Sequence, residues 1–350
     1  MTRLGDAAQG RVNNVRVLRH VAAAMVIVFH SFALTAQPGL DPLHRVVPGA
    51  TLGTLGVQVF FVLSGFLVTQ SWCAHPRLRP FAAARVLRIY PALVAATLVT
   101  IALAGATSAL PLPDYLEHPD TRRYLWRTAT GIAGTDLLPG AYVHNPYPRA
   151  PNGSLWTLPV EIRLYIAIAL AGVLGILARR VAATLAGVIV LALLVHAPWP
   201  LAIVFDAIAS HTLVMLFALG SLAYVWRDRV PLSLAAAAIA LALYVALPPG
   251  FWRTGATPAL VGYVTLVAAY HPRLVVPRLA RGADLSYGLY VYAFPIQQTL
   301  LAMDTGLGAW TLCAATAPLV VAAAALSWFG VERPALHLKS RFREQRASPP

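Results

Sequence analysis

Charged side chains are scarce in this sequence. They make up only 11% of the 350 residues, and just 13 residues are acidic, while 58% are apolar. A soluble domain carries about 25% charged and about 45–50% apolar residues. The chain also lacks any hydrophilic stretch long enough to fold on its own. These shortages exclude an ordinary water-soluble protein and indicate a chain that lies mostly within a lipid bilayer.

Several familiar functional patterns are missing as well. The only cysteines, Cys73 and Cys313, predict neither a disulfide framework nor a redox compartment. No Gly-x-Ser-x-Gly, Cys-x-x-Cys, His-Glu-x-x-His or phosphate-cradling glycine loop occurs. The net charge of +14 is not gathered into a basic domain, so nucleic acid is not an expected partner. The first apolar run is too long for a cleavable signal peptide and contains Arg19 and His30.

Long apolar runs repeat from one end of the chain to the other. A helix needs about 20 mainly apolar residues to cross a hydrocarbon core of about 30 Å. Ten runs meet this length approximately, which predicts an all-α polytopic membrane protein with about ten transmembrane helices. The predicted spans are 15–36, 52–72, 81–106, 154–178, 181–199, 201–226, 231–249, 255–271, 283–303 and 308–329.

The basic residues predict the orientation of these spans. With the N-terminus inside, nineteen of the 27 Lys and Arg residues fall in inner segments, six fall in outer loops, and Arg19 and Arg163 lie within spans. Short cytoplasmic loops collect Lys and Arg. We therefore expect one integral membrane domain over residues 1–350 in the plasma (inner) membrane, in contact with lipid, with both termini cytoplasmic and a tail at about 331–350.

The longest outer segment covers about residues 107–153. It contains a plausible interfacial helix near 120–137 and an aromatic, proline-rich stretch after it. Two interpretations stay open. The segment forms a lid or vestibule, or it is a connecting loop with one amphipathic helix lying in the membrane interface.

Ionisable residues inside spans are costly to insert, by about 2.5–3.5 kcal/mol each, and therefore indicate function. Arg19 and His30 are 11 residues apart in the first span, which is three turns plus about 20°, so both lie on one helix face about 16 Å apart along the axis. His30 has the chemistry of a general base for a hydroxyl. The alternatives are snorkelling of Arg19 to the inner surface and a helix–helix hydrogen bond for His30.

Glu161 lies in the fourth span, about 10 Å below its outer end at 1.5 Å per residue. The same arithmetic puts His30 at a similar depth, so the carboxylate is expected to meet and orient the imidazole. The alternative is an ion pair between Glu161 and Arg163, or between Glu161 and an arginine of another helix.

Arg85 and Arg88 are three residues apart near the inner end of the third span and share a helix face. Guanidinium groups match phosphate oxygens, so this pair suits the phosphates of a cytoplasmic donor. The preference for arginine at inner membrane surfaces would also place them there. A metal site that combines Asp206 and His211 with Glu161 and His30 has no signature spacing, and no metal is expected.

The chain resembles the membrane-bound acyltransferase-3 family along nearly its whole length. Six short motifs carry the resemblance, each weak alone but all in the expected order. They are Arg-x10-His (Arg19, His30), Phe-Phe-x-x-Ser-Gly (Phe60, Phe61, Ser64, Gly65), Arg-x-x-Arg (Arg85, Arg88), Ser-Leu-Trp-Thr-Leu-x-x-Glu (Ser154, Trp156, Glu161), Ser-Tyr-Gly-x-Tyr (Ser286, Tyr287, Tyr290) and Glu-Arg-Pro (Glu332, Pro334).

The resemblance implies an enzyme that transfers an acyl group, acetyl in the first instance, from acyl-CoA to a hydroxyl of a surface polysaccharide, lipopolysaccharide or lipid-linked saccharide. It implies catalytic roles for His30, Glu161 and Arg19. It also implies donor binding by Arg85, Arg88, Ser64 and Gly65, the glycine permitting a close helix approach. The residues do not predict an oligomeric state.

The chain departs from the family pattern at one position, and it lacks a domain that some relatives carry. Many relatives have a histidine where this chain has Ala293, and the chain ends soon after the last span without an extracellular hydrolase-like domain. A transporter or flippase of a lipid-linked saccharide is the alternative function. It would favour internally repeated halves or paired discontinuous helices, which the sequence does not show. A structural subunit of an export complex would not need Arg19, His30 and Glu161 at these depths.

Overall fold

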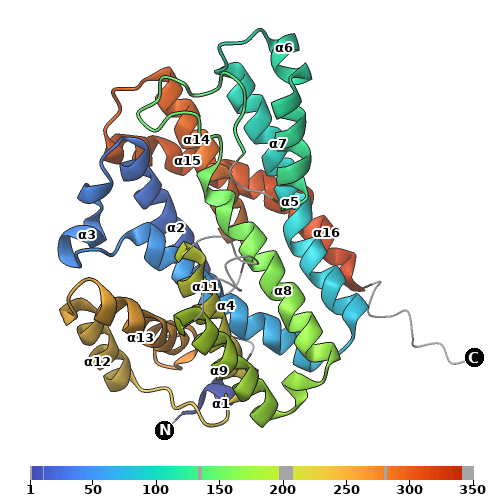
Figure 1. The fold of residues 1–350 in the computed structure, drawn as a ribbon, viewed down its shortest axis with the longest axis vertical. Coiled ribbons are helices and arrows are strands. Elements are labelled where there is room, and N and C mark those ends of the chain that lie inside the picture. Colours follow the sequence, from blue (N-terminus) through green and yellow to red (C-terminus); the bar gives the residue numbers. More distant parts are fainter. Residues whose placement is uncertain (1, 11, 133–135, 197–207, 280–281, 341–350) are drawn as a thin grey trace, which may run out of the picture.

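The computed structural model describes residues 2–10, 12–132, 136–196, 208–279 and 282–340, and this part of the chain is built from helices with no β-strand (Figure 1). The predicted all-α class is therefore confirmed. Each of the ten predicted spans contains a helix. These helices are α2 (Val15–Leu34), α4 (Leu52–Ala74), α5 (Leu78–Ala106), α8 (Leu158–Val173), α9 (Arg180–His196), α11 (Ile208–Val225), α12 (Leu234–Ala246), α13 (Phe251–Tyr270), α14 (Ser286–Met303) and α15 (Ala309–Ser327).

Five helical stretches of the described residues are both long enough and apolar enough to cross a membrane. They contain α2, α4, α5, α8 and α15. The chain is accordingly a multi-pass membrane protein. Short helices complete the fold: α1 (Leu4–Gln9), η1 (Pro38–Leu40), α3 (Pro42–Val46), α6 (Leu112–Glu117), α7 (Pro119–Ala129), η2 (Gly153–Thr157), η3 (Ile176–Ala178), the π-helical turn η4 (Trp328–Glu332) and α16 (Arg333–His337).

One predicted span is much longer than the observed helix, and the beginning of another lies outside the described residues. The span predicted at 231–249 is only 13 residues long as α12, about 20 Å, which is short of the hydrocarbon core. Ser233 has an extended backbone, and its hydroxyl caps α12 by accepting a hydrogen bond from the Ala236 N–H, so the helix begins after it. The first residues of the span predicted at 201–226 lie outside the described residues.

The span predicted at 154–178 starts as a 3-10 helix, η2, and becomes the α-helix α8 only at Leu158. Pro159 explains the change, because a proline fits the first turn of an α-helix, where its missing N–H breaks no hydrogen bond. The consequence is functional: Glu161 sits in the first turn of α8. Prolines deeper in helices, such as Pro91 in α5 and Pro295 in α14, do not end them.

Helix α4 lies at the centre of the bundle and packs against α2, α8, α11 and α13. Its glycines allow backbones to approach closely. A Cβ added at Gly65 would lie 2.1 Å from the Phe217 carbonyl oxygen, and one at Gly220 would lie 2.2 Å from the Val62 carbonyl oxygen. Small residues at helix contacts serve this purpose in membrane proteins. The α4–α11 contact therefore fixes the position of the face of α4 that carries Ser64.

The segment between α5 and α8 begins with α6 and α7, at the end of the molecule opposite α1 (Figure 1). The helix predicted near 120–137 is α7, which ends earlier, at Ala129, and packs against α5. Tyr115, Tyr124 and Tyr142 form a small buried core there. The rest of the segment is tied to α14 through buried amide side chains, so both of its ends are anchored to the bundle.

Candidate active site

A cavity of about 120 Å³ lies between α2, α4, α5, α8 and α14. Most of the surface area of its wall is apolar, although ten of the residues that line it are polar or ionisable. Three are arginines and one is a carboxylate, so the wall carries an excess of positive charge. These residues are Arg19, Arg85, Arg88, Glu161, Ser64, Thr157, Tyr165, Ser286, Tyr287 and Tyr290.

The three arginines come from the N-terminal parts of two helices. Arg19 lies in the second turn of α2, while Arg85 and Arg88 share one face of α5, three residues apart. The structure brings all three into the wall of one cavity. Such a grouping of like charges needs counterions, and two carboxylates supply them.

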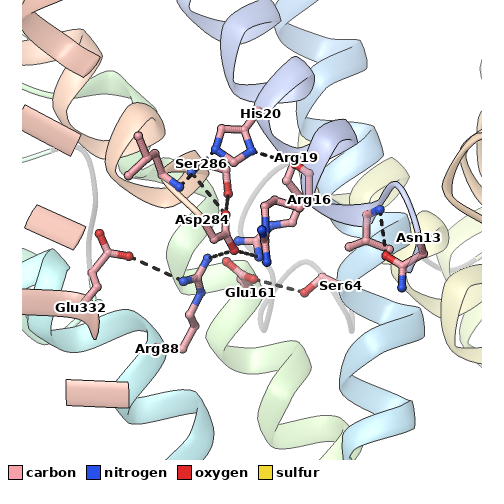
Figure 2. Close-up of polar contacts among 12 residues, drawn as sticks. Asn13, Arg16, Arg19, His20, Ser64, Arg88, Glu161, Asp284, Ser286 and Glu332 are labelled. Atoms are coloured by element: carbon pink, nitrogen blue, oxygen red, sulfur yellow. Dashed lines mark hydrogen bonds and ion pairs between the residues drawn. The ribbon is translucent and has the colours of Figure 1, made fainter. Parts of the chain in front are cut away.

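Asp284, in the turn before α14, binds two of these arginines with a single oxygen. Its Oδ2 accepts a hydrogen bond of 2.8 Å from Arg19 Nη1 and another of 2.8 Å from Arg88 Nη2 (Figure 2). Its Oδ1 accepts from the hydroxyl of Ser286 at 2.6 Å. Arg88 also lies 3.6 Å from Glu332 Oε2, and the Glu332 side chain is only 2% exposed. Arg19 and Arg88 are thus held by acids from distant parts of the chain.

His20 fixes the turn that carries Asp284. Its Nδ1 lies 2.8 Å from the Arg16 carbonyl oxygen, and its Nε2 lies 3.1 Å from the Leu285 backbone nitrogen. A carbonyl oxygen only accepts and an amide N–H only donates. The imidazole is therefore neutral, with its proton on Nδ1, and α2 holds the backbone next to Asp284 directly.

Arg85 differs from the other two arginines because no carboxylate of the described residues lies within ion-pair distance of it. Its guanidinium carbon lies 5.8 Å from the ring centroid of Phe81 and 5.6 Å from that of Tyr165. Its Nε is buried and has no hydrogen-bond partner. Aromatic faces steady a cation without neutralising it, so Arg85 keeps a full charge available to an anion in the cavity.

Glu161 contacts hydroxyl groups. Its Oε1 accepts a hydrogen bond of 3.2 Å from Ser64 Oγ (Figure 2) and a second one from the Tyr165 hydroxyl. The helix dipole favours a negative charge in the first turn of α8. Within the described part of the chain, neither an ion pair with Arg163 nor a hydrogen bond with His30 is present for Glu161.

His30 lies away from the cavity wall. Its ring packs edge-on against Phe294 of α14, with 5.0 Å between the ring centroids, and beside Phe29 at 5.5 Å. Its Nδ1 is buried and has no hydrogen-bond partner. The cavity wall includes Tyr290, which is four residues before Phe294 and so one turn away on the same face of α14. The structure therefore brings Arg19, Arg85, Arg88, Ser64 and Glu161 together in one cavity wall, and His30 is not among the residues that line it.

The remaining predicted site residues are placed as follows. Gly65 packs against α11 and is absent from the residues that line the cavity. Ala293, at the position of a family histidine, is buried with 1% exposure. Asp206 lies outside the described residues, and the described residues contain no group of three His, Cys, Asp or Glu side chains able to hold a metal ion.

The sequence did not predict Asp284 as a site residue, and it indicated Glu332 only as part of the Glu-Arg-Pro motif. An acidic residue just before an apolar span, in a loop rich in arginine, was a usable signal for Asp284, because an acid there has several cations within reach. His20 was also overlooked, since its role depends on a backbone nitrogen more than 260 residues away in the sequence.

Comparisons with known proteins agree on one family. The acyltransferase domain model of the acyltransferase-3 family matches residues 12–331. The chain is 28% identical to nodulation protein 10 of Rhizobium leguminosarum bv. viciae, over 98% of both chains. It is 27% identical to an O-acetyl transferase of Shigella phage Sf6, over 90% of this chain and 93% of the relative. No solved structure matches the chain.

Proposed function

Because the chain belongs to the acyltransferase-3 family, we propose that it moves an acyl group, in the first instance acetyl, from acyl-CoA to a hydroxyl of a surface polysaccharide, lipopolysaccharide or lipid-linked saccharide. The printed name of the Sf6 relative supports acetyl transfer to oxygen. Family membership favours this enzyme over a transporter or flippase. The distribution of basic residues supports the inner membrane and cytoplasmic termini, with residues 1–350 acting as one membrane domain.

The observation that carries the donor assignment is the unpaired charge of Arg85 in the cavity wall. Acyl-CoA carries several phosphates, and a guanidinium group binds phosphate oxygens through paired, charge-assisted hydrogen bonds. Arg19 and Arg88 are held beside Arg85 by Asp284, so their charges are already in place before a donor arrives. The apolar remainder of the cavity suits the acyl chain and the thioester arm.

His30 is the proposed general base for the acceptor hydroxyl. Its imidazole is half-buried and has no hydrogen-bond partner at Nδ1, so this nitrogen is free to accept the proton of a hydroxyl group. The contacts of Glu161 with Ser64 and Tyr165 favour a separate role for this carboxylate, at the donor side of the reaction. Arg19 binds the same oxygen of Asp284 as Arg88 does, and in this way it helps to position the donor site.

The donor assignment is tested by substituting Arg85→Ala and comparing two acyl donors. One is acetyl-CoA, and the other is S-acetyl-N-acetylcysteamine, a thioester without phosphates. Loss of a hydrogen bond to a charged group costs about 1.5–3 kcal/mol, or roughly 10- to 100-fold in affinity. We expect the KM for acetyl-CoA to rise by about this factor, while the KM for the short thioester stays unchanged.

Arg180→Ala is the matched control, because Arg180 also packs on an aromatic ring, that of Trp226, but lies outside the cavity. It should leave both KM values at the wild-type level. An Arg85→Ala enzyme with an unchanged KM for acetyl-CoA would contradict the donor assignment.

A further inference from the structure

Three aliphatic hydroxyl groups belong to the cavity wall, those of Ser64, Thr157 and Ser286. Thr157 and Ser286 are buried, and their hydroxyls are engaged with Tyr290 and Asp284, respectively. Ser64 is partly exposed. Among these three groups, the Ser64 hydroxyl is thus the one a molecule in the cavity can reach.

The Ser64 hydroxyl is also placed against a base. Its Oγ lies 3.2 Å from Glu161 Oε1 and 3.1 Å from the Tyr165 hydroxyl oxygen. The single Tyr165 proton goes to the same Glu161 oxygen. A nucleophile within hydrogen-bond reach of a base that a third group orients is the arrangement of covalent catalysis. Here Ser64 is the nucleophile, Glu161 is the base, and Tyr165 is the group that orients the base.

We propose that Ser64 is an acyl-accepting nucleophile, so that transfer proceeds through an ester on Ser64. The inference rests on the proposed function and adds a step to it. Ser64 Oγ gives its proton to Glu161 and attacks the thioester carbonyl of the acyl-CoA. The new C–O bond forms, the C–S bond breaks, and the CoA thiolate leaves and takes a proton from water.

The second half-reaction returns every group to its starting state. The acceptor hydroxyl gives its proton to His30, and its oxygen attacks the carbonyl of the Ser64 ester. The bond between the acyl carbon and Oγ breaks, and Glu161 returns the proton to Oγ. His30 then releases its proton to water, which balances the proton taken by the thiolate.

Because Glu161 acts in the first half-reaction and His30 in the second, the two proposed bases do not need to touch each other. Glu161 touches the donor-side hydroxyl, while His30 packs on Phe294, one turn of α14 beyond the cavity residue Tyr290. The rings of Phe60 and Tyr290 lie in the cavity wall with 5.9 Å between centroids. With the acyl group on Ser64, acyl-CoA stays beside the arginines, and only the acceptor has to approach from the His30 side.

The test uses full-length enzyme in lipid nanodiscs with acetyl-CoA and labelled CoA, without an acceptor. An enzyme that forms an acyl ester exchanges labelled CoA into acetyl-CoA under these conditions. We expect exchange by the wild-type protein and an acetyl group on the peptide that contains Ser64. Ser64→Ala should show neither, and Glu161→Gln should slow exchange by about 10²–10⁴-fold, the usual loss for a general base.

Two further variants separate chemistry from misfolding. Ser64→Cys should form a thioester that neutral hydroxylamine cleaves, whereas the wild-type oxygen ester resists it. Ser221→Ala removes a serine that contacts backbone carbonyls of α4 and α11 outside the cavity, and it should exchange like the wild type.

Exchange or acceptor acylation by Ser64→Ala at the wild-type rate would overturn the proposal, as would a wild-type enzyme that acylates an acceptor without exchanging CoA. Failure of the wild-type enzyme to release CoA or to acylate any saccharide acceptor would instead overturn the proposed function itself.

Discussion

Helix α14 joins two polar clusters that are built in opposite ways. At its beginning, Asp284 and Ser286 belong to a cluster of charged side chains around an open cavity. Farther along the same helix, Gln297 and Gln298 are 0% exposed and bind uncharged partners. Gln297 Nε2 donates to the Ile27 carbonyl oxygen and to Ser31 Oγ, and Gln298 Nε2 donates to carbonyl oxygens of the segment between α5 and α8.

Only the charged cluster has the properties of a ligand site. Burying a neutral amide costs little once it is hydrogen-bonded, whereas burying a charge is expensive unless a counterion accompanies it. The amides donate to carbonyl oxygens and to one serine hydroxyl of the protein, and thereby tie α2 and the segment between α5 and α8 to α14. The charged cluster keeps Arg85 without a counterion beside empty space, which is useful only if an anion enters.

His30 lies closer to the amide cluster than to the charged cluster. Its substitution tests whether the part of α14 near the amide cluster has a structural role only. We expect His30→Ala to lower kcat by about 10²–10⁴-fold, the usual contribution of a general base, with unchanged membrane insertion and melting temperature. The measurement is saccharide acylation by the purified variant. His75→Ala, which removes an exposed histidine at the end of α4, serves as the control. Normal transfer by His30→Ala would remove catalysis from this end of α14.

Asp284→Ala removes the acid on which the charged cluster depends. Breaking a buried ion pair by deleting one partner costs about 3–5 kcal/mol, because the remaining charge stays buried without compensation. Arg19 and Arg88 are only 22% and 18% exposed. Arg19 would lose its one carboxylate partner among the described residues, while Arg88 would keep only Glu332, at 3.6 Å. We expect a large fall in the melting temperature in detergent, together with a higher KM for acyl-CoA.

Asp304→Ala is the comparison for this variant, since Asp304 is an exposed acid just after the other end of α14. It should change stability far less. If Asp284→Ala melts at the wild-type temperature, the view that two arginines depend on one carboxylate is wrong.

The positions of the helices were predictable because runs of about 20 apolar residues have one favourable arrangement in a bilayer. Helix ends were less predictable. The proline pair at 248–249 and the capping hydroxyl of Ser233 were visible in the sequence, yet the apolar run around them continues, so α12 was predicted too long.

Most residues of the candidate site could be predicted from the sequence, but the contacts between them could be predicted only in part. Spacing along a helix fixes the depth of a side chain and its rotation relative to its own helix. It does not fix how that helix is rotated against its neighbours, which tertiary packing decides. Glu161 and His30 therefore share a predicted depth without a contact in the structure, while Arg85 and Arg88, on one helix, were correctly placed together. Asp284 could not be paired with Arg19 without knowing that α14 lies beside α2.

Gln298→Leu tests whether the buried amides have a structural role only. The change removes the donor to the Tyr147 and Ala150 carbonyl oxygens and the acceptor of Asn145 Nδ2. Unpaired buried groups cost about 1–3 kcal/mol, so we expect a moderate fall in melting temperature. The KM for acyl-CoA should stay the same, because none of these atoms lines the cavity. A raised donor KM would show that the two clusters are coupled and would break the contrast between them.

Arg180→Ala gives the smallest expected effect and tests why the charged cluster matters. Arg180 binds Asp228 at 2.9 Å, nearly the distance between Arg19 and Asp284. The Arg180 and Asp228 side chains are 43% and 47% exposed, however. Water therefore screens their attraction, and Asp228 remains solvated when Arg180 is removed. We expect no measurable change in melting temperature at moderate salt. A loss as large as that of Asp284→Ala would mean that ion-pair distance, and not burial, decides what these arginines contribute.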